Sequence, residues 1–107
     1  MAVATNVIQL SYNMQFEWDS DKATANYCKH RIRFENAVRV FSDPHRIEKL
    51  DTRRDYDEDR WKTIGFVEPG LLAVIYTIRG DDGQTIRIIS ARKATTYEKK
   101  QYREIQF

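Results

Sequence analysis

The 107-residue sequence has little of several residues that mark common protein classes: one cysteine, two prolines and four glycines. The single cysteine, Cys28, cannot form an intramolecular disulfide, which excludes a disulfide-stapled secreted fold. No apolar run approaches the roughly 20 residues of a membrane-spanning helix, since the longest covers residues 71–76. The first 13 residues lack the basic and apolar regions of a secretory signal. These absences predict a folded cytoplasmic protein with no membrane segment.

Histidine is equally scarce, because His30 and His45 are the only two and lie fifteen positions apart. No HxxxH or CxxC pair accompanies them, so the spacing typical of zinc sites is missing. Walker, G-x-G-x-x-G and G-x-S-x-G motifs are also absent. The sequence therefore predicts no cofactor and no metal, and any catalysis is expected to be metal-free.

Charge is abundant but unevenly distributed. The net charge is +2, yet residues 86–104 hold six basic and two acidic residues, and the remaining 88 hold twelve basic and fourteen acidic ones. A cationic patch of this size suits phosphate or an acidic partner. The alternative is an ordinary solvated helix face.

Apolar spacing predicts the order of the elements. Residues 15–18 alternate like a strand, and residues 20–30 and 34–42 carry helical spacing that ends at Asp43-Pro44. Further strands are expected over residues 45–50, 61–67, 71–78 and 84–90, and a last helix from Thr95 toward residue 107.

This order predicts an α+β fold, with an antiparallel sheet of four or five strands packed against two N-terminal helices and one C-terminal helix. Residues 14–107 are expected to form one domain. Residues 1–13 are interpreted as a flexible lead, or as the product of an upstream start codon read in error.

The densest group of polar residues lies near the carboxyl end. A buried strand delivers Arg87, Arg92 and Lys93 to the sheet margin just before a helix start, where guanidinium groups and free amides suit phosphate. The alternative is that Arg92 and Lys93 pair with the acidic loop at residues 51–60.

Four further residues carry chemistry in this interpretation. Trp61 follows Arg60, so an indole can stack on an unpaired base while the guanidinium holds its phosphate. The alternative is that Trp61 is ordinary core. Histidine is the residue type whose ordinary pKa lies near neutrality, as a proton carrier requires, so His30 is a candidate for proton transfer. The alternative is a capping or packing role at the helix end. Arg79 is expected at the same margin as Arg92 if the hairpin at residues 80–83 closes tightly.

Several stretches together resemble the BrnT family of toxins. They are Phe16-Glu17-Trp18-Asp19 with Lys22 and Asn26; Lys29-His30 followed by Phe34-Glu35-Asn36-Ala37; Arg60-Trp61; and residues 87–95, RIISARKAT, with Glu98 and Tyr102. The resemblance covers nearly all of residues 16–102. It departs from the family at Arg31, where the family usually has glycine.

The resemblance implies a RelE-like fold and a metal-independent endoribonuclease that cleaves RNA and blocks translation. It also implies neutralisation by a BrnA-like antitoxin in a hetero-oligomer, with promoter DNA bound only through the antitoxin. In this hypothesis Arg60, Arg79 and Arg92 stabilise the phosphorane, Lys93 assists, and His30 transfers a proton. Trp61, Arg87 and Ser90 bind the substrate.

Two alternatives remain open at this stage. In the first, the chain is a non-catalytic module that docks an acidic or DNA-binding partner as a transcriptional co-regulator. In the second, it is a degenerate toxin. Growth inhibition by the chain alone, relieved by the product of the adjacent small gene, distinguishes an enzyme from a docking module.

Overall fold

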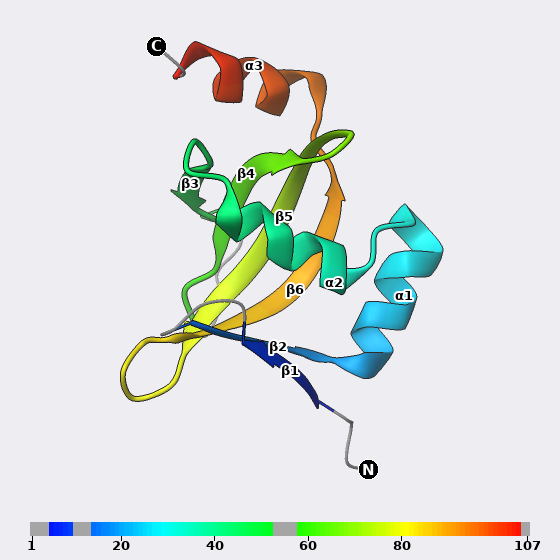
Figure 1. Cartoon of the computed structure of the whole chain (residues 1–107), viewed down its shortest axis with the longest axis vertical. Coiled ribbons are helices and arrows are strands. Elements are labelled where there is room, and N and C mark those ends of the chain that lie inside the picture. Colours follow the sequence, from blue (N-terminus) through cyan, green and yellow to red (C-terminus); the bar gives the residue numbers. More distant parts are fainter. Residues whose placement is uncertain (1–4, 10–13, 53–57, 106–107) are drawn as a thin grey trace.

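A computed structural model describes residues 14–52 and 58–105, and the backbone alone of residues 5–9 (Figure 1). The strands are β1 Thr5–Gln9, β2 Gln15–Asp19, β3 Ile47–Leu50, β4 Trp61–Val67, β5 Gly70–Arg79 and β6 Thr85–Lys93. The helices are α1 Ser20–His30, α2 Phe34–Ala37, the 3₁₀ helix η1 Val38–Ser42 and α3 Thr96–Glu104.

One sheet contains all the described strands, in the order β1-β2-β6-β5-β4-β3. The predicted α+β class is confirmed, and β2 to β6 supply five strands, within the predicted number. The sheet is larger than predicted because β1 adds a sixth strand next to β2. This strand lies within residues 1–13, which were interpreted as a flexible lead; residues 1–4 and 10–13 lie outside the described residues.

The expectation of a wholly antiparallel sheet is wrong at one pair, because β2 runs parallel to β6. A tight hairpin forces its two strands to be antiparallel, whereas a long connection does not. After β2 the chain forms α1, α2, η1, β3, β4 and β5, and only then does β6 pair with β2. Sequence periodicity carries no information on that distant pairing.

Capping residues explain where the helices begin and end. At α1 the Asp19 carboxylate accepts hydrogen bonds from the N–H groups of Asp21 at 2.8 Å and Lys22 at 3.1 Å. Its end is Arg31, which adopts a left-handed conformation with φ 60°. Glycine adopts this conformation without steric cost, so Arg31 occupies a position that favours glycine. The predicted bounds of α1 are confirmed.

The second predicted helix, residues 34–42, is present as α2 followed by η1 rather than as one α-helix. It packs closely on the sheet, since a Cβ at Gly65 of β4 would lie 2.9 Å from Cγ1 of Val40. The last helix begins at the predicted capping box formed by Thr95 and Glu98.

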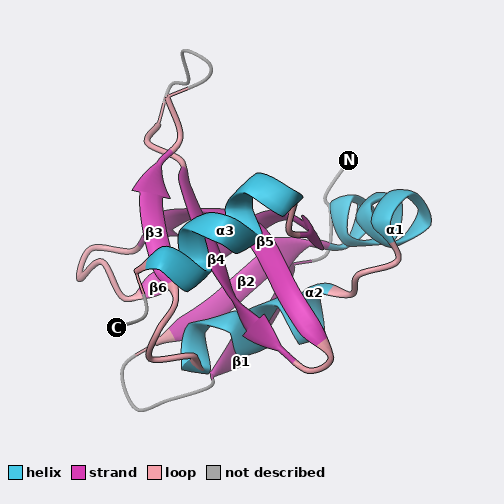
Figure 2. Ribbon diagram, turned by 90° about the horizontal axis from the view of Figure 1, so that it is seen from above, coloured by secondary structure: helices cyan, strands magenta, loops and turns pink. Residues whose placement is uncertain are grey.

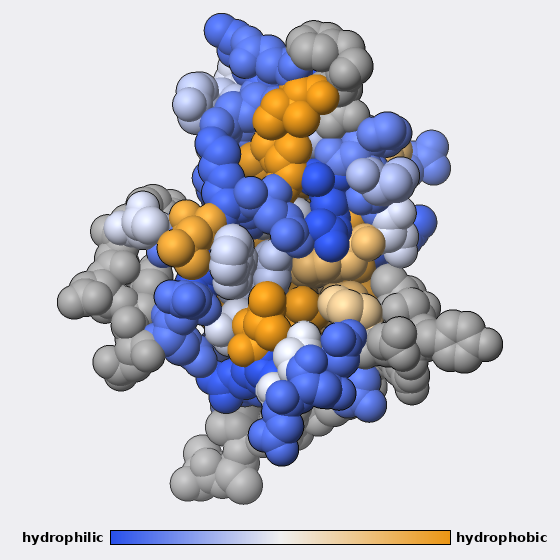
Figure 3. Space-filling view, turned by 90° about the vertical axis from the view of Figure 1, so that its left-hand side faces the viewer, coloured by the Kyte–Doolittle hydropathy of each residue, from blue (hydrophilic) through white to orange (hydrophobic). Residues whose placement is uncertain are grey.

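The core lies mainly between the sheet and the first two helices. That cluster includes Phe16, Trp18, Phe34, Tyr76 and Ile88. A smaller cluster of Ile47, Ile64, Ala73 and Ala94 forms on the other side of the sheet, where α3 contacts β4 (Figure 2). The side of the molecule that carries β3 is largely hydrophilic, with apolar residues in separate patches (Figure 3). One face of the sheet is therefore covered by helices, and the other is covered by α3 only in part.

Candidate active site

A β-bulge in β6 sets the direction of the candidate side chains. Ile75 of β5 pairs with Ser90, but its neighbour Tyr76 pairs with Ile88, so Ile89 is an extra residue in β6. An extra residue shifts the alternation of side chains by one position. Ser90 and Arg92 therefore share a face with Arg87, whereas Ile88 and Ala91 point into the core.

Cross-strand register adds two lysines to that face. Lys62 of β4 pairs with Ile75, which pairs with Ser90, and Lys49 of β3 pairs with Lys62. Directly paired residues project from the same side of a sheet. We call this side the polar face, defined by Lys49, Lys62, Arg87, Ser90 and Arg92. Sequence reasoning missed both lysines, because only the register of β3, β4 and β5 brings them to β6.

The buried carboxylate of Glu98 organises the polar face. Glu98 is 3% exposed, and its two oxygens accept hydrogen bonds from Nη1 and Nη2 of Arg92 at 2.7 and 2.9 Å. Nζ of Lys62 donates at 2.7 Å and the N–H of Thr95 at 2.9 Å. Burial alone would raise the pKa of Glu98, but these hydrogen bonds outweigh it and hold the pKa far below its usual value. The carboxylate is charged at neutral pH and fixes two cations from two strands.

Two other predicted arginines also have carboxylate partners. Arg87 forms an ion pair with Glu17, its register partner on β2. Arg79 binds both oxygens of Glu58 at 3.1 Å, which ties the end of β5 to the acidic loop. Residues 53–57 of that loop lie outside the described residues.

The predicted site is nevertheless not one cluster. Arg79 pairs with Thr85 and Arg92 pairs opposite Ala73, so the two arginines lie at opposite ends of the β5–β6 pair. With a rise of about 3.3 Å per residue, this separates them by roughly 20 Å along β5. The expectation that they share a margin is wrong. Arg79 lies next to the β5–β6 turn, whereas β6 runs away from that turn before it reaches Arg92.

Four predicted residues lie away from the polar face. Trp61 packs against the main core from the helix-covered side. Lys93, one residue after Arg92, lies beside the β4–β5 turn, and His30 ends α1. Arg60 immediately precedes β4, where its carbonyl accepts a hydrogen bond from the N–H of Asp51 at 2.7 Å.

A buried asparagine supports the bulged part of β6. The Nδ2 of Asn26 donates to the carbonyl of Ala91 at 2.9 Å, and the N–H of Ala91 donates to Oδ1 at 3.1 Å. The pairing of β2 with β6 ends at Arg87, so the amide of Asn26 takes the place of a strand neighbour. A second bond from Nδ2, to the carbonyl of Ile32 at 3.1 Å, ties the connection between α1 and α2 to the same point. Asn26 was noted in the sequence only as part of the family resemblance.

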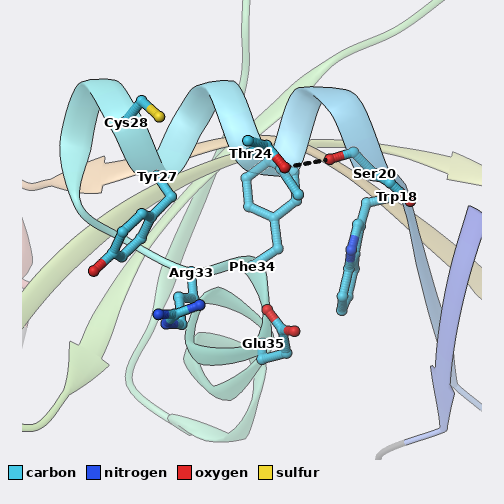
Figure 4. Close-up of a pocket in the computed structure, with 9 residues that line it drawn as sticks. Trp18, Ser20, Thr24, Tyr27, Cys28, Arg33, Phe34 and Glu35 are labelled. Carbon is cyan, nitrogen blue, oxygen red and sulfur yellow. Dashed lines mark hydrogen bonds between the residues drawn. The ribbon is translucent and has the colours of Figure 1, made fainter.

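A hollow of about 350 Å³ lies elsewhere, between α1 and the start of α2 (Figure 4). Tyr27 lines it, with the guanidinium of Arg33 4.4 Å from the ring centroid. None of the predicted site residues lines this hollow. Among the described residues, no three histidine, cysteine, aspartate or glutamate side chains are grouped as a metal site. No helix in this part of the chain is long and apolar enough to cross a membrane.

Residues 18–98 match the family described as ribonuclease toxin, BrnT, of type II toxin-antitoxin systems. The chain belongs to the BrnT family. No curated protein matches it. The crystal structure of the Brucella abortus ribonuclease toxin BrnT is similar, with 25% sequence identity and a TM-score of 0.54, over 74% of this chain and 94% of that one. The likeness of the fold to RelE stays a prediction.

Membership of this family identifies the chain as a ribonuclease toxin of a type II toxin–antitoxin pair, so an antitoxin is its partner. The BrnT match begins at Trp18 and ends at Glu98. It therefore spans the polar face and Asn26 but only the first turn of α3. Lys99, Tyr102 and Arg103 lie beyond the matched residues.

Proposed function

We propose that the chain is a metal-independent endoribonuclease whose active site is the polar face. The observation that carries the proposal is the pair of cations held by one buried carboxylate. Arg92 and Lys62 share Glu98, yet 27% and 21% of their side chains are exposed to solvent. Two positive groups are thus fixed in position and still accessible to a phosphate.

RNA cleavage without a metal requires a 2′-hydroxyl to attack the adjacent phosphorus, charge stabilisation on the phosphorane, and protonation of the departing 5′-oxygen. Cations that are already oriented stabilise developing charge without a cost of reorganisation during the reaction. We assign this role to Arg92, with Lys62 beside it. Arg87 and Ser90, from the same strand and face, bind the neighbouring phosphate and sugar.

Proton transfer is the weaker part of this site. His30 lies at the end of α1, and His45 follows η1 away from β6. Neither histidine belongs to the strands that form the polar face. The proposed mechanism therefore relies on electrostatic stabilisation, and water carries the protons. We leave the predicted catalytic residues that lie away from the polar face outside the catalytic group: His30, Arg60, Arg79 and Lys93.

The biological role follows from this activity. Cleavage of RNA in the cytoplasm stops translation and growth, and a BrnA-like antitoxin neutralises the toxin by binding it. In this proposal the pair contacts its promoter DNA through the antitoxin.

The test is cleavage of labelled RNA by the purified chain in excess EDTA, with substrate offered as free RNA and as mRNA on translating ribosomes. Arg87→Gln and Arg92→Lys are the variants, because the lysine keeps the charge but loses the planar fork. Arg39→Gln, at an exposed arginine of η1, is the control. Near-UV circular dichroism confirms that each variant is folded.

We expect cleavage to survive chelation and each polar-face variant to lower the rate by about 100-fold, the usual loss for one stabilising donor. The control should cleave at the parent rate. Cleavage that stops in EDTA would overturn metal independence. Full activity of Arg87→Gln and Arg92→Lys would place the active site elsewhere, and no cleavage of either substrate would contradict the proposal as a whole.

A further inference from the structure

A groove of about 580 Å³ lies between α2 and α3, at the end of the sheet where β4 turns into β5. This volume is in the range of sites that accept several side chains. Its floor is largely apolar, from residues around the β4–β5 turn and one residue between α1 and α2: Ile32, Phe66, Val67, Pro69, Leu71 and Leu72. Phe66 is 49% exposed, so its ring is accessible to a partner that enters the groove.

Three cations stand around this apolar floor: Lys93 from β6, and Lys99 and Arg103 from α3. All three are exposed. Within the part of the chain that the structure describes, none of them makes an ion pair. Glu68 is the single acidic residue of the lining. The groove thus carries a net charge of +2 that the described residues leave uncompensated.

The walls of the groove are fixed by hydrogen bonds. The hydroxyl of Tyr102 donates to Oδ2 of Asp43 at 2.6 Å, and the same oxygen accepts from the N–H of Phe66 at 2.8 Å. Burial and this bond raise the pKa of Tyr102 to about 12, so the hydroxyl stays protonated at neutral pH. Asp43 therefore links α3 to the end of β4, and a partner meets a preformed groove.

The lining indicates a protein segment as the occupant. Nucleotides bind by stacking on aromatic rings, but the floor is mostly aliphatic. Aliphatic floors instead accept leucine-like side chains, with charged residues at the rim setting orientation. Three cations at the rim require carboxylates on the partner. An amphipathic segment with acidic and apolar residues satisfies both conditions.

We propose that this groove docks an acidic amphipathic segment of the antitoxin. The identity of the partner rests on the proposed function, whereas the chemistry of the segment comes from the groove. Docking here seats the antitoxin against α3, the helix whose Glu98 holds Arg92 and Lys62 of the polar face. None of the residues that define the polar face lines the groove, so docking and the proposed active site use different residues around one helix.

The test measures binding of the purified chain to the purified product of the adjacent small gene by titration calorimetry. Lys99→Glu/Arg103→Glu reverses the charge of the rim, and Phe66→Ala removes apolar area from the floor. Lys22→Glu/Lys29→Glu, on exposed positions of α1, makes the same change in net charge. Ile78→Ala is the matched control for Phe66→Ala, because Ile78 is 48% exposed but lies outside the groove.

We expect the rim variant to weaken binding at least 30-fold at low salt and by less as salt is raised, because salt screens rim charges. Phe66→Ala should weaken binding about tenfold at every salt concentration. Neither control should change the dissociation constant by more than twofold. RNA cleavage is measured on the same variants without the antitoxin and should stay at the parent rate.

Three results would overturn the proposal. Unchanged binding by both groove variants would place the antitoxin elsewhere, while leaving the ribonuclease assignment intact. Loss of RNA cleavage with unchanged antitoxin binding would assign the groove to RNA. No binding by the unmodified chain would contradict the proposed partner itself, and the docking inference with it.

Discussion

The polar face and the groove are both cationic, but they differ in how their charges are compensated. On the polar face Arg87 pairs with Glu17, and Arg92 and Lys62 share Glu98. Around the groove no described carboxylate forms an ion pair with any of the three cations. Arginine and lysine side chains that lie a few positions apart along β6 and α3 are therefore held by carboxylates on the polar face and are available to a partner at the groove.

This difference separates two uses of positive charge. A cation fixed by a carboxylate loses conformational freedom during folding, so it is already oriented when charge develops in a reaction. An exposed cation without a partner keeps its long-range field, which attracts an acidic partner and speeds association. Cations paired with a carboxylate are therefore suited to stabilising charge in a reaction, and unpaired cations are suited to binding an acidic partner. Stability measurements distinguish the two uses, because removing a paired cation's partner weakens the fold, whereas removing an unpaired cation does not.

Glu98→Gln should have the largest effect. Glutamine still fits the capping box at the start of α3, so the substitution mainly removes the charge that Arg92 and Lys62 share. Breaking a buried ion pair typically costs about 3–5 kcal/mol, and we expect a loss of about 3 kcal/mol in the free energy of unfolding, measured by urea denaturation. A loss below about 1 kcal/mol would show that the two cations do not depend on Glu98.

The pH dependence of stability gives a second, gradual effect. The folded pKa of Glu98 is lowered, so its contribution is present above the usual glutamate value of 4.5 and is lost as the pH falls below it. The difference in unfolding free energy between the parent and Glu98→Gln should narrow steadily as the pH is lowered below 4.5. A difference that stays constant down to the acid transition would mean that Glu98 is not ionised in the folded protein.

The half-buried pair between β2 and β6 should contribute less. The side chains of Arg87 and Glu17 are 23% and 22% exposed, so solvent weakens their attraction. Glu17→Gln should cost about 1 kcal/mol of unfolding free energy in urea. Glu58→Gln, in the more exposed pair with Arg79, is the control and should cost less than about 0.5 kcal/mol. Equal losses in the two variants would contradict the ranking by burial.

The groove should show the smallest effect on stability. Lys99→Gln/Arg103→Gln removes two exposed cations without ion-pair partners in the described chain, and surface changes of this kind usually stay within about 0.5 kcal/mol. Urea denaturation should show no loss beyond that. A loss above about 1 kcal/mol would indicate that these cations support the fold, as those of the polar face do.

Local features were predictable from the sequence because local interactions decide them. Asp19 begins α1, the Thr95 capping box begins α3, and glycines close the β5–β6 turn. The polar residues that precede the last helix also indicated Arg87 and Arg92, the family resemblance added Ser90, and the structure brings these three to one face.

Features that depend on strand register were not predictable. The bulge at Ile89 decides which residues of β6 share a face, and the register of β4 decides that Lys62 meets Glu98. The parallel pairing of β2 and β6, and Asn26 at its end, depend on contacts between distant segments. A single sequence carries the pattern of each strand but not the alignment between strands.

The central claim is that cleavage and antitoxin docking use different surfaces. The most direct test measures both properties, the rate of RNA cleavage in EDTA and the dissociation constant of the antitoxin complex, for Arg87→Gln and for Lys99→Glu/Arg103→Glu. We predict that Arg87→Gln loses cleavage by about 100-fold and binds the antitoxin within threefold of the parent, and that the groove variant does the reverse. Loss of both properties in both variants would contradict the separation and would mean that one surface serves RNA and antitoxin alike.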